Sequence, residues 1–237
     1  MVPERRPAFL ATAIGRRLIV SSLKLLPLAA LIKTSEIDHA EWNYRSLLGW
    51  IQRLRFRQIV AMIASQRFHR MLEIGYGSGV FLPELKRHCE ELYGIDPHVK
   101  GGEVQAILTR YGVEAKLLRG SVTRMPFGRE FFDCLVSVSA LEYVDELESA
   151  CQEMMRVLKR DGVLVMVTPC YSILLEAGLR ALTGRGAREY LAGRWQELDR
   201  SLQKGFVVEK RVDIPRPGFR VTRLYIAQTL RARRALE

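Results

Sequence analysis

The sequence predicts an α/β fold in which a mostly parallel sheet carries helices on both faces. Two short apolar strands end on acids, Glu73 and Asp96, and a helical segment separates them, which indicates a βαβ unit. Residues 132–139 form a nearly continuous apolar run, as expected for a central parallel strand that is buried on both faces. One α/β domain with additions fits a chain of 237 residues.

The first strand runs into three glycines spaced two apart, Gly75, Gly77 and Gly79. Glycine suits a strand that turns sharply into a helix with its backbone amides against a ligand, because a Cβ would block the approach. Asp96 follows Gly79 by 17 residues, where one βαβ step places a carboxylate for a ribose diol. The glycines alone could form a turn without a ligand, but the two signals together predict a nucleotide-binding pocket.

The glycine spacing distinguishes between nucleotide ligands. A dinucleotide-binding turn has its third glycine three residues after the second, whereas Gly79 follows Gly77 by two, and Glu73 precedes Gly75 by two. In these residues the chain resembles the class I S-adenosylmethionine-dependent methyltransferases, whose first motif is Glu-x-Gly-x-Gly-x-Gly. The resemblance covers about residues 70–170 and continues through residues 120–127, 132–139 and 153–162. It implies a Rossmann-like, seven-stranded, mostly parallel sheet with an antiparallel edge strand.

The remaining elements follow from periodicity and turn residues. Helices are expected over residues 80–89, 103–111 and 145–159, and strands over residues 113–118 and 163–168. Beyond Pro169 we expect helices over residues 171–183 and 187–203, then strands over residues 206–213 and 221–230. The Pro- and Gly-containing connection at residues 215–218 joins these strands as a hairpin, which would supply the antiparallel edge of the sheet.

The chain is expected to have two parts, an N-terminal helical extension over residues 1–68 and an S-adenosylmethionine-binding domain over residues 69–237. Apolar side chains recur at helical spacing between residues 37 and 68. In the resembling family such helices often form a lid over the substrate, while plain core packing is the alternative for Trp42, Tyr44 and Trp50.

Residues 1–35 contain six basic residues and one acid, and their apolar runs are shorter than the roughly 20 residues that cross a bilayer. Leu10, Ile14, Leu18 and Leu25 share one helical face, and Arg16, Arg17 and Lys24 share another. The pattern fits a helix in a membrane interface, an amphipathic helix packed on the core, or a mitochondrial transit segment. A cytoplasmic location, peripheral to a membrane if the first alternative holds, is expected.

The net charge of +11 is unevenly distributed, at +8 over residues 1–70, −5 over residues 71–179 and +8 over residues 180–237. Basic flanks could contact nucleic acid, an anionic membrane or an acidic substrate, or simply face solvent. The sequence contains no recognisable nucleic-acid module, so no nucleic-acid partner is expected. The four cysteines and four histidines lack metal-ligand spacing, so no metal is expected and a reducing compartment fits best.

By resemblance, S-adenosylmethionine is the expected cofactor. Glu73 would lie near its methionine ammonium, and Gly75, Tyr76 and Gly77 would line the methionine and ribose through their backbone. Asp96 would accept from both ribose hydroxyls, which suits a carboxylate.

The resemblance also implies the rest of the cofactor site. Ser121 and Val122 would border the adenine, with Ser121 where many relatives have Asp. Ser137 and Val138, at the end of the fourth strand, would line the methionine moiety.

The implied reaction is an in-line methyl transfer to an oxygen, carbon or nitrogen of a small or lipid-like acceptor. The sulfonium supplies the electrophile, so the protein must mainly bind, orient and exclude water. Glu142 and Tyr143 are the candidates for a general base, but Tyr143 stands where quinone- and sterol-type relatives often have His, and no base follows by analogy. The alternative is a cofactor-binding accessory of a membrane or biosynthetic complex without turnover of its own; a nicotinamide-dependent dehydrogenase conflicts with the glycine spacing.

Overall fold

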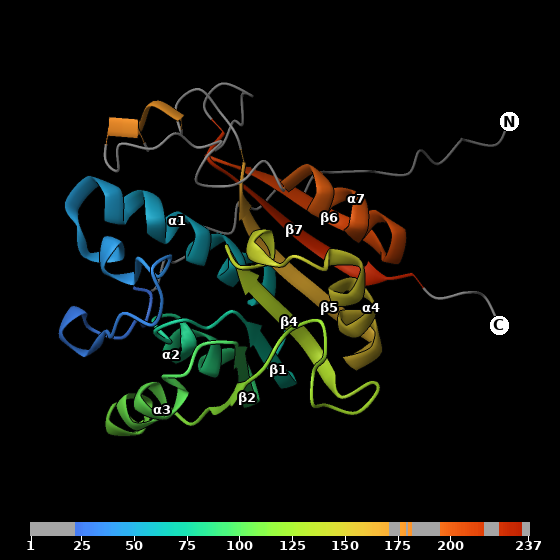
Figure 1. Ribbon diagram of the computed structural model, residues 1–237, viewed down its shortest axis with the longest axis horizontal. Helices are drawn as coiled ribbons and strands as arrows, with labels where there is room; N and C mark the ends of the chain where they lie inside the picture. The colour runs from blue at the N-terminus through green and yellow to red at the C-terminus, as the bar shows by residue number, and fades with distance from the viewer. Residues whose placement is uncertain (1–21, 171–175, 179, 182–194, 216–222, 234–237) are drawn as a thin grey trace, which may run out of the picture.

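The chain forms one seven-stranded sheet in the order β3-β2-β1-β4-β5-β7-β6. The computed structural model describes residues 22–170, 176–178, 180–181, 195–215 and 223–233 (Figure 1). The strands are β1 Phe68–Ile74, β2 Cys89–Asp96, β3 Lys116–Arg119, β4 Phe132–Val138, β5 Leu158–Pro169, β6 Phe206–Ile214 and β7 Tyr225–Ala232. The predicted mostly parallel α/β fold is confirmed.

Strands β1 to β5 run parallel, and β7 runs antiparallel to both β5 and β6. The expected antiparallel strand is therefore β7, which lies between β5 and the edge strand β6. Ile74 of β1 pairs with Ile95 of β2 on one side and with Ser137 of β4 on the other. The carboxyl ends of these three strands thus meet at one edge of the sheet, where open α/β sheets bind ligands.

Helices cover both faces of the sheet (Figure 1). The helices of one face are α1 Ser46–Ile63, α2 Leu82–Leu85 and α3 Gly101–Arg110, and those of the other are α4 Leu147–Val157 and α7 Trp195–Gly205. Met71 packs in the core under α1 to α3, and the next residue, Leu72, packs in the core under α4 and α7. Because successive strand side chains point to opposite faces, a strand buried on both must be apolar at every position.

Three of the expected helices are shorter in the structure, among them the helix expected over residues 145–159, which is α4. The helix expected over residues 37–68 becomes a 3₁₀ turn, Ala40–Tyr44, followed by α1, and Phe68 already begins β1. The helix expected over residues 80–89 is the single turn of α2 followed by the 3₁₀ turn Lys86–His88, because Cys89 begins β2.

The described part of the N-terminal segment, residues 22–35, is extended apart from a 3₁₀ turn at Leu28–Ala30. Leu26 is buried; its N–H donates to the Val80 carbonyl (3.2 Å), and its carbonyl accepts from the Tyr44 hydroxyl. The expected amphipathic helix is thus wrong for Lys24 and Leu25, while residues 1–21 lie outside the described part. Within the described ranges, no helix is long and apolar enough to cross a membrane.

Candidate functional site

A cavity of about 850 Å³ opens at the carboxyl ends of β1, β2 and β4. Its walls come from the glycine loop, residues 95–99, residues 120–123, residues 138–146 and parts of the N-terminal region. Of the predicted site residues it brings together Glu73, Gly75, Tyr76, Gly77, Asp96, Ser121, Val122, Val138, Glu142 and Tyr143. Ser137 is the exception, because it does not line the cavity.

Gly75 and Gly77 shape the loop for different reasons. Both have positive φ, +76° at Gly75 and +50° at Gly77, a conformation that L side chains rarely adopt. A Cβ on Gly75 would lie 2.4 Å from the Ala140 side chain, so packing also requires glycine there. A Cβ on Gly77 would lie in ordinary contact with the Asp38 carboxylate, at 3.6 Å. Backbone conformation, not lack of space, therefore excludes other residues at Gly77.

Asp96 ties the end of β2 to the glycine loop. Its Oδ2 accepts the Gly77 N–H (2.9 Å) and its Oδ1 accepts the His98 N–H (3.1 Å). A carboxylate has about four acceptor positions, so these two bonds leave capacity for a ligand's hydroxyls.

His98 braces the same junction, and the sequence analysis did not identify it. Its Nε2 lies 3.0 Å from the Gly77 carbonyl oxygen, and its Nδ1 accepts the Lys100 N–H (3.1 Å). Because Nδ1 is an acceptor, Nε2 carries the proton and donates to Gly77. The only sign of its role in the sequence was its position two residues after Asp96.

Glu73 is a buried acid, 4% exposed, and its Oε2 has no hydrogen-bond partner. Burial, with a smaller contribution from the nearby Asp96 carboxylate, raises the pKa of Glu73 well above its ordinary value. An unfilled acceptor beside a glycine loop is suited to a cationic donor. That Glu73 lies near the methionine ammonium of S-adenosylmethionine stays a prediction.

Tyr76 lies in the glycine loop, and its backbone carbonyl accepts the Gly79 N–H (2.8 Å). Its ring is buried and packs edge-on against His98, with ring centroids 5.0 Å apart. The Tyr76 hydroxyl has no partner, and burial, followed by the Asp96 charge, raises its pKa to about 12.

Residues 120–123 form another wall. Ser121 is exposed; its Oγ accepts the Thr123 N–H (3.2 Å) and lies 2.8 Å from the Thr123 hydroxyl oxygen. Val122 is buried and offers an apolar surface. A flat apolar surface beside a hydroxyl suits a purine, so the expected adenine position stays a prediction consistent with this geometry.

The end of β4 differs in detail from expectation. Ser137 is 1% exposed and pairs inside the sheet with Ile74 and Met166, which keeps it out of the cavity wall. The wall is made by Val138 and Ser139. Ser139 has a positive φ of +54°, an uncommon backbone conformation for a residue with a side chain.

Arg55 of α1 reaches the end of β4, and sequence reasoning missed it. Its Nη1 donates to the Ser139 hydroxyl (3.0 Å) and its Nε to the Gln52 carbonyl (3.1 Å). Its guanidinium carbon lies 5.2 Å from the Phe56 ring centroid and 5.9 Å from that of Tyr225. An arginine among apolar helical positions reads as solvent-facing, so only the packing of α1 over the sheet reveals its place.

The two candidate catalytic residues differ in environment. Glu142 is 3% exposed and neither carboxyl oxygen has a hydrogen-bond partner on another residue; burial raises its pKa to about 8, although its own backbone N–H and the nearby Arg55 charge oppose the rise. Tyr143 is 37% exposed at the cavity rim. The structure thus distinguishes a buried, unpartnered acid from a surface phenol.

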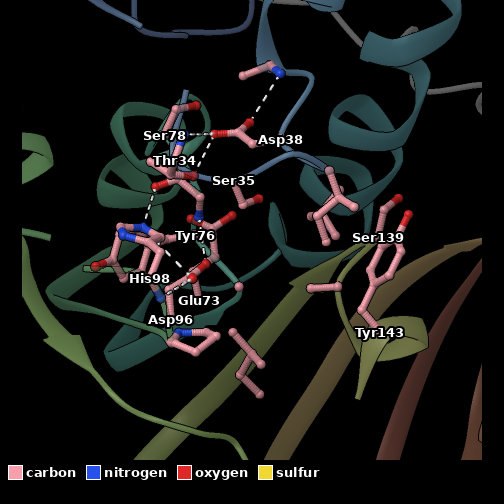
Figure 2. Close-up of a pocket in the computed structure, with 18 of the residues that line it drawn as sticks. Thr34, Ser35, Asp38, Glu73, Tyr76, Ser78, Asp96, His98, Ser139 and Tyr143 are labelled. Carbon is pink, nitrogen blue, oxygen red and sulfur yellow. Dashed lines mark hydrogen bonds and ion pairs between the residues drawn. The ribbon is translucent and has the colours of Figure 1, made fainter. Parts of the chain in front are cut away.

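The N-terminal segment closes one side of the cavity. Asp38 Oδ2 accepts from the Thr34 hydroxyl (2.7 Å), its Oδ1 accepts the Ala40 N–H (3.2 Å), and Lys100 Nζ donates to the Lys33 carbonyl (2.8 Å). Figure 2 shows Asp38 and Thr34 beside the glycine loop, with Tyr143 across the cavity. Within the described ranges, no group of three or more His, Cys, Asp or Glu side chains is arranged to hold a metal ion.

Comparisons with known proteins match this chain to methyltransferases. Residues 72–166 match the family described as "Methyltransferase domain". The chain is 33% identical over 114 residues to a phosphatidylethanolamine N-methyltransferase of Cereibacter sphaeroides, covering 47% of this chain and 56% of that protein. It is 27% identical over 163 residues to a ubiquinone/menaquinone biosynthesis C-methyltransferase of Pseudomonas paraeruginosa, covering 61% of this chain and 62% of that protein. These matches span only about half to three fifths of each relative's length.

Among solved structures, the N-methyltransferase NodS of Bradyrhizobium japonicum, in complex with S-adenosyl-L-homocysteine, is similar in fold. Its TM-score is 0.56 at 22% identity, covering 77% of this chain and 87% of that one. S-adenosylmethionine is the cofactor of the class to which the matched domain belongs. Residues 72–166 thus match the methyltransferase domain family, and the chain has the fold of the class I S-adenosylmethionine-dependent methyltransferases.

Proposed function

We propose that the chain transfers a methyl group from S-adenosylmethionine to a small-molecule or lipid-like acceptor by in-line displacement. The observation that carries the proposal is the junction of glycine loop and β2, where Asp96 holds the Gly77 N–H and Glu73 offers an unpartnered oxygen. When bound, the sulfonium supplies an electrophilic methyl carbon. The protein's part is to bind and orient both reactants and to exclude water.

The site residues are assigned by their acceptors and surfaces. Asp96 accepts hydrogen bonds from the ribose hydroxyls at the acceptor positions that the Gly77 and His98 N–H groups do not use. Glu73 binds the methionine ammonium. Gly75, Tyr76 and Gly77 present backbone groups. Ser121 and Val122 border the adenine, and Val138 faces the methionine moiety while Ser137 supports it from within the sheet.

The N-terminal region acts as the lid of this site, with the boundary near residue 68. Support comes from the Thr34–Asp38 turn, which lies against the glycine loop, and from the Lys100 bond to the Lys33 carbonyl. The lid would exclude water from the reacting atoms once both ligands are bound.

The acceptor is small or lipid-like because the far half of the cavity combines aromatic and apolar walls, among them Trp42, Phe56 and Tyr225. The names of two relatives point to a lipid and to quinone biosynthesis. Peripheral membrane contact through residues 1–35 would bring such an acceptor close. The exposed apolar side chains Leu28, Ile37 and Leu47 add to that surface.

Calorimetric titration of the full chain with S-adenosylmethionine, S-adenosylhomocysteine and NAD tests the cofactor assignment. Binding of the first two and not of NAD is expected, and binding of NAD alone would overturn it. Turnover with methyl-labelled cofactor on a library of metabolites and lipids then separates the two remaining hypotheses. Tight cofactor binding with no labelled product from any acceptor would favour the accessory protein.

A further inference from the structure

The cavity is acidic although the chain is basic. The net charge is +11, yet among the residues that the structure describes the lining includes a single arginine, Arg55, and several acids: Asp38, Glu73, Asp96, Glu142, Asp145 and Glu146. Clefts lined by one sign of charge concentrate ligands of the opposite sign. Three of these acids, Asp38, Glu73 and Asp96, lie at the glycine loop, which leaves Glu142 and the exposed Asp145 and Glu146 on the other side of the cavity.

Among these acids, Glu142 is the one whose buried carboxyl is best suited to bind a ligand. It is 3% exposed in the cavity wall, and neither of its oxygens has a hydrogen-bond partner on another residue. A buried carboxyl without partners is costly, and a donor on a bound molecule would remove that cost. Arg55 does not provide the donor, because the structure gives no ion pair between them and its Nη1 and Nε already donate to Ser139 and Gln52.

Aromatic side chains complete the surroundings. Trp42, stacked on His39 at a centroid distance of 4.3 Å, lies in the N-terminal wall, and Tyr143 and Tyr225 come from the other side. Aromatic faces attract alkylammonium groups and also accept apolar stems. An acid in a cavity wall that also contains aromatic and apolar side chains is therefore suited to an amine carried on an apolar body.

We propose that the methyl acceptor is an amine whose nitrogen is bound by Glu142; this rests on the proposed methyltransferase function. The ionised form of Glu142 receives the incoming ammonium; the proton moves from nitrogen to a Glu142 oxygen, and both charges disappear. The nitrogen keeps the electron pair of the broken N–H bond and becomes the nucleophile. Its bond to the methyl carbon would form as the bond between that carbon and the cofactor's sulfur breaks, with the sulfur keeping that electron pair. No oxidant or reductant is needed, and the proton later leaves Glu142 for solvent.

Burial favours this arrangement, because a low-dielectric wall stabilises a neutral amine and a neutral carboxyl over an ion pair. The raised pKa of Glu142 agrees with the carboxyl holding the proton. An anionic acceptor would instead bring a like charge to the acids of the rim. Arg55 would instead attract an anionic acceptor. The test must therefore compare ligands of similar size and shape that differ in charge.

The test uses three probes of the same size and shape: 2-phenylethylamine, 2-phenylethanol and phenylacetate. Each is titrated by calorimetry into the full chain saturated with S-adenosylhomocysteine, so that binding is read without turnover. The amine should bind and the alcohol and the acid should bind roughly tenfold more weakly or not at all. Glu142→Gln should lose that preference while its affinity for S-adenosylhomocysteine is unchanged, and Glu103→Gln, an exposed change on α3, should behave as the unaltered chain.

Equal or tighter binding of phenylacetate, or no binding of the amine at millimolar concentration, overturns the proposal. So does an amine preference that survives in Glu142→Gln. The charge series on the unaltered chain decides the matter even if the variant does not fold. Failure of S-adenosylhomocysteine to bind would instead reject the proposed function, which keeps the two failures distinct.

Discussion

Replacing Glu142 by Gln should stabilise the ligand-free protein relative to the unaltered chain, by an amount that grows as the pH rises. The Glu142 carboxyl is buried without a partner, and its pKa is raised from 4.5 to about 8. Between these values the folded chain holds a proton that the unfolded chain releases, so the free energy of unfolding falls with increasing pH. One pKa unit corresponds to about 1.36 kcal/mol, so the loss reaches roughly 5 kcal/mol at most above pH 8.

Glutamine keeps the size of the side chain and cannot ionise. The difference in unfolding free energy between Glu142→Gln and the unaltered chain should therefore be small near pH 5 and grow in favour of the variant toward pH 8. Comparing the two chains cancels the contributions of other groups, including Glu73, which has a raised pKa for the same reason. The charged and titratable neighbours of Glu142 are Arg55 from α1 and Tyr225 from β7, and both stay in place.

Urea unfolding followed by circular dichroism at pH 5, 6, 7 and 8 measures the difference. Glu103→Gln serves as the control, since it makes the same chemical change on an exposed side chain of α3. A difference between Glu142→Gln and the unaltered chain that stays constant across this range would refute the reasoning. It would mean that Glu142 ionises freely in the folded protein.

Four further results are expected. Asp96→Ala should weaken S-adenosylhomocysteine binding by about 1 to 3 kcal/mol in calorimetry, since ribose hydroxyls lose a charged acceptor and the Gly77 N–H loses its partner; unchanged affinity removes Asp96 from the site. Gly77→Val should abolish that binding through its positive φ and retain a folded far-ultraviolet spectrum, and normal affinity would contradict the placement of the cradle. Tyr76→Phe should not lower the unfolding free energy, because its buried hydroxyl has no partner, and a loss above about 1 kcal/mol would reveal a hidden bond. A chain that begins at Ser22, which keeps the buried Leu26, should lose sedimentation with anionic vesicles at low salt, and equal recovery of both chains in the supernatant would leave residues 1–21 with no role at membranes.

Local patterns predicted the strands of the core because burial on both faces favours apolar residues at most positions, as in β4. They failed for the lengths of helices, which depend on tertiary contacts. The chain reaches Cys89 of β2 after only two short turns because that residue must align with Phe68 of β1. The N-terminal segment is extended because its Leu26 backbone bonds to Val80 and Tyr44, partners remote in sequence.

The candidate site was predictable where one short stretch contributes its residues, as in the glycine loop and Asp96. It was not predictable where distant elements meet. Arg55 reaches Ser139 only because α1 packs over the end of β4, and Asp38 reaches the glycine loop only because the N-terminal segment folds back. Ser137 and Ser139 could not be told apart from sequence, since they lie two residues apart around the end of β4 and the point where the strand ends decides which of them lines the cavity.

Unpartnered buried polar atoms are concentrated around the cavity. Within the described ranges, five of the nine residues with such atoms line it: Asn43, Glu73, Tyr76, Ser78 and Glu142. Each such atom destabilises the ligand-free fold, by about 1 to 3 kcal/mol where a donor or acceptor is fully lost. A ligand that supplies the missing partners offsets this cost and adds the linkage term that grows with its concentration. The same atoms that destabilise the ligand-free protein thus favour ligands whose donors match Glu73 and Glu142. Cofactor and acceptor should therefore each raise the midpoint temperature of unfolding, and both together should raise it further.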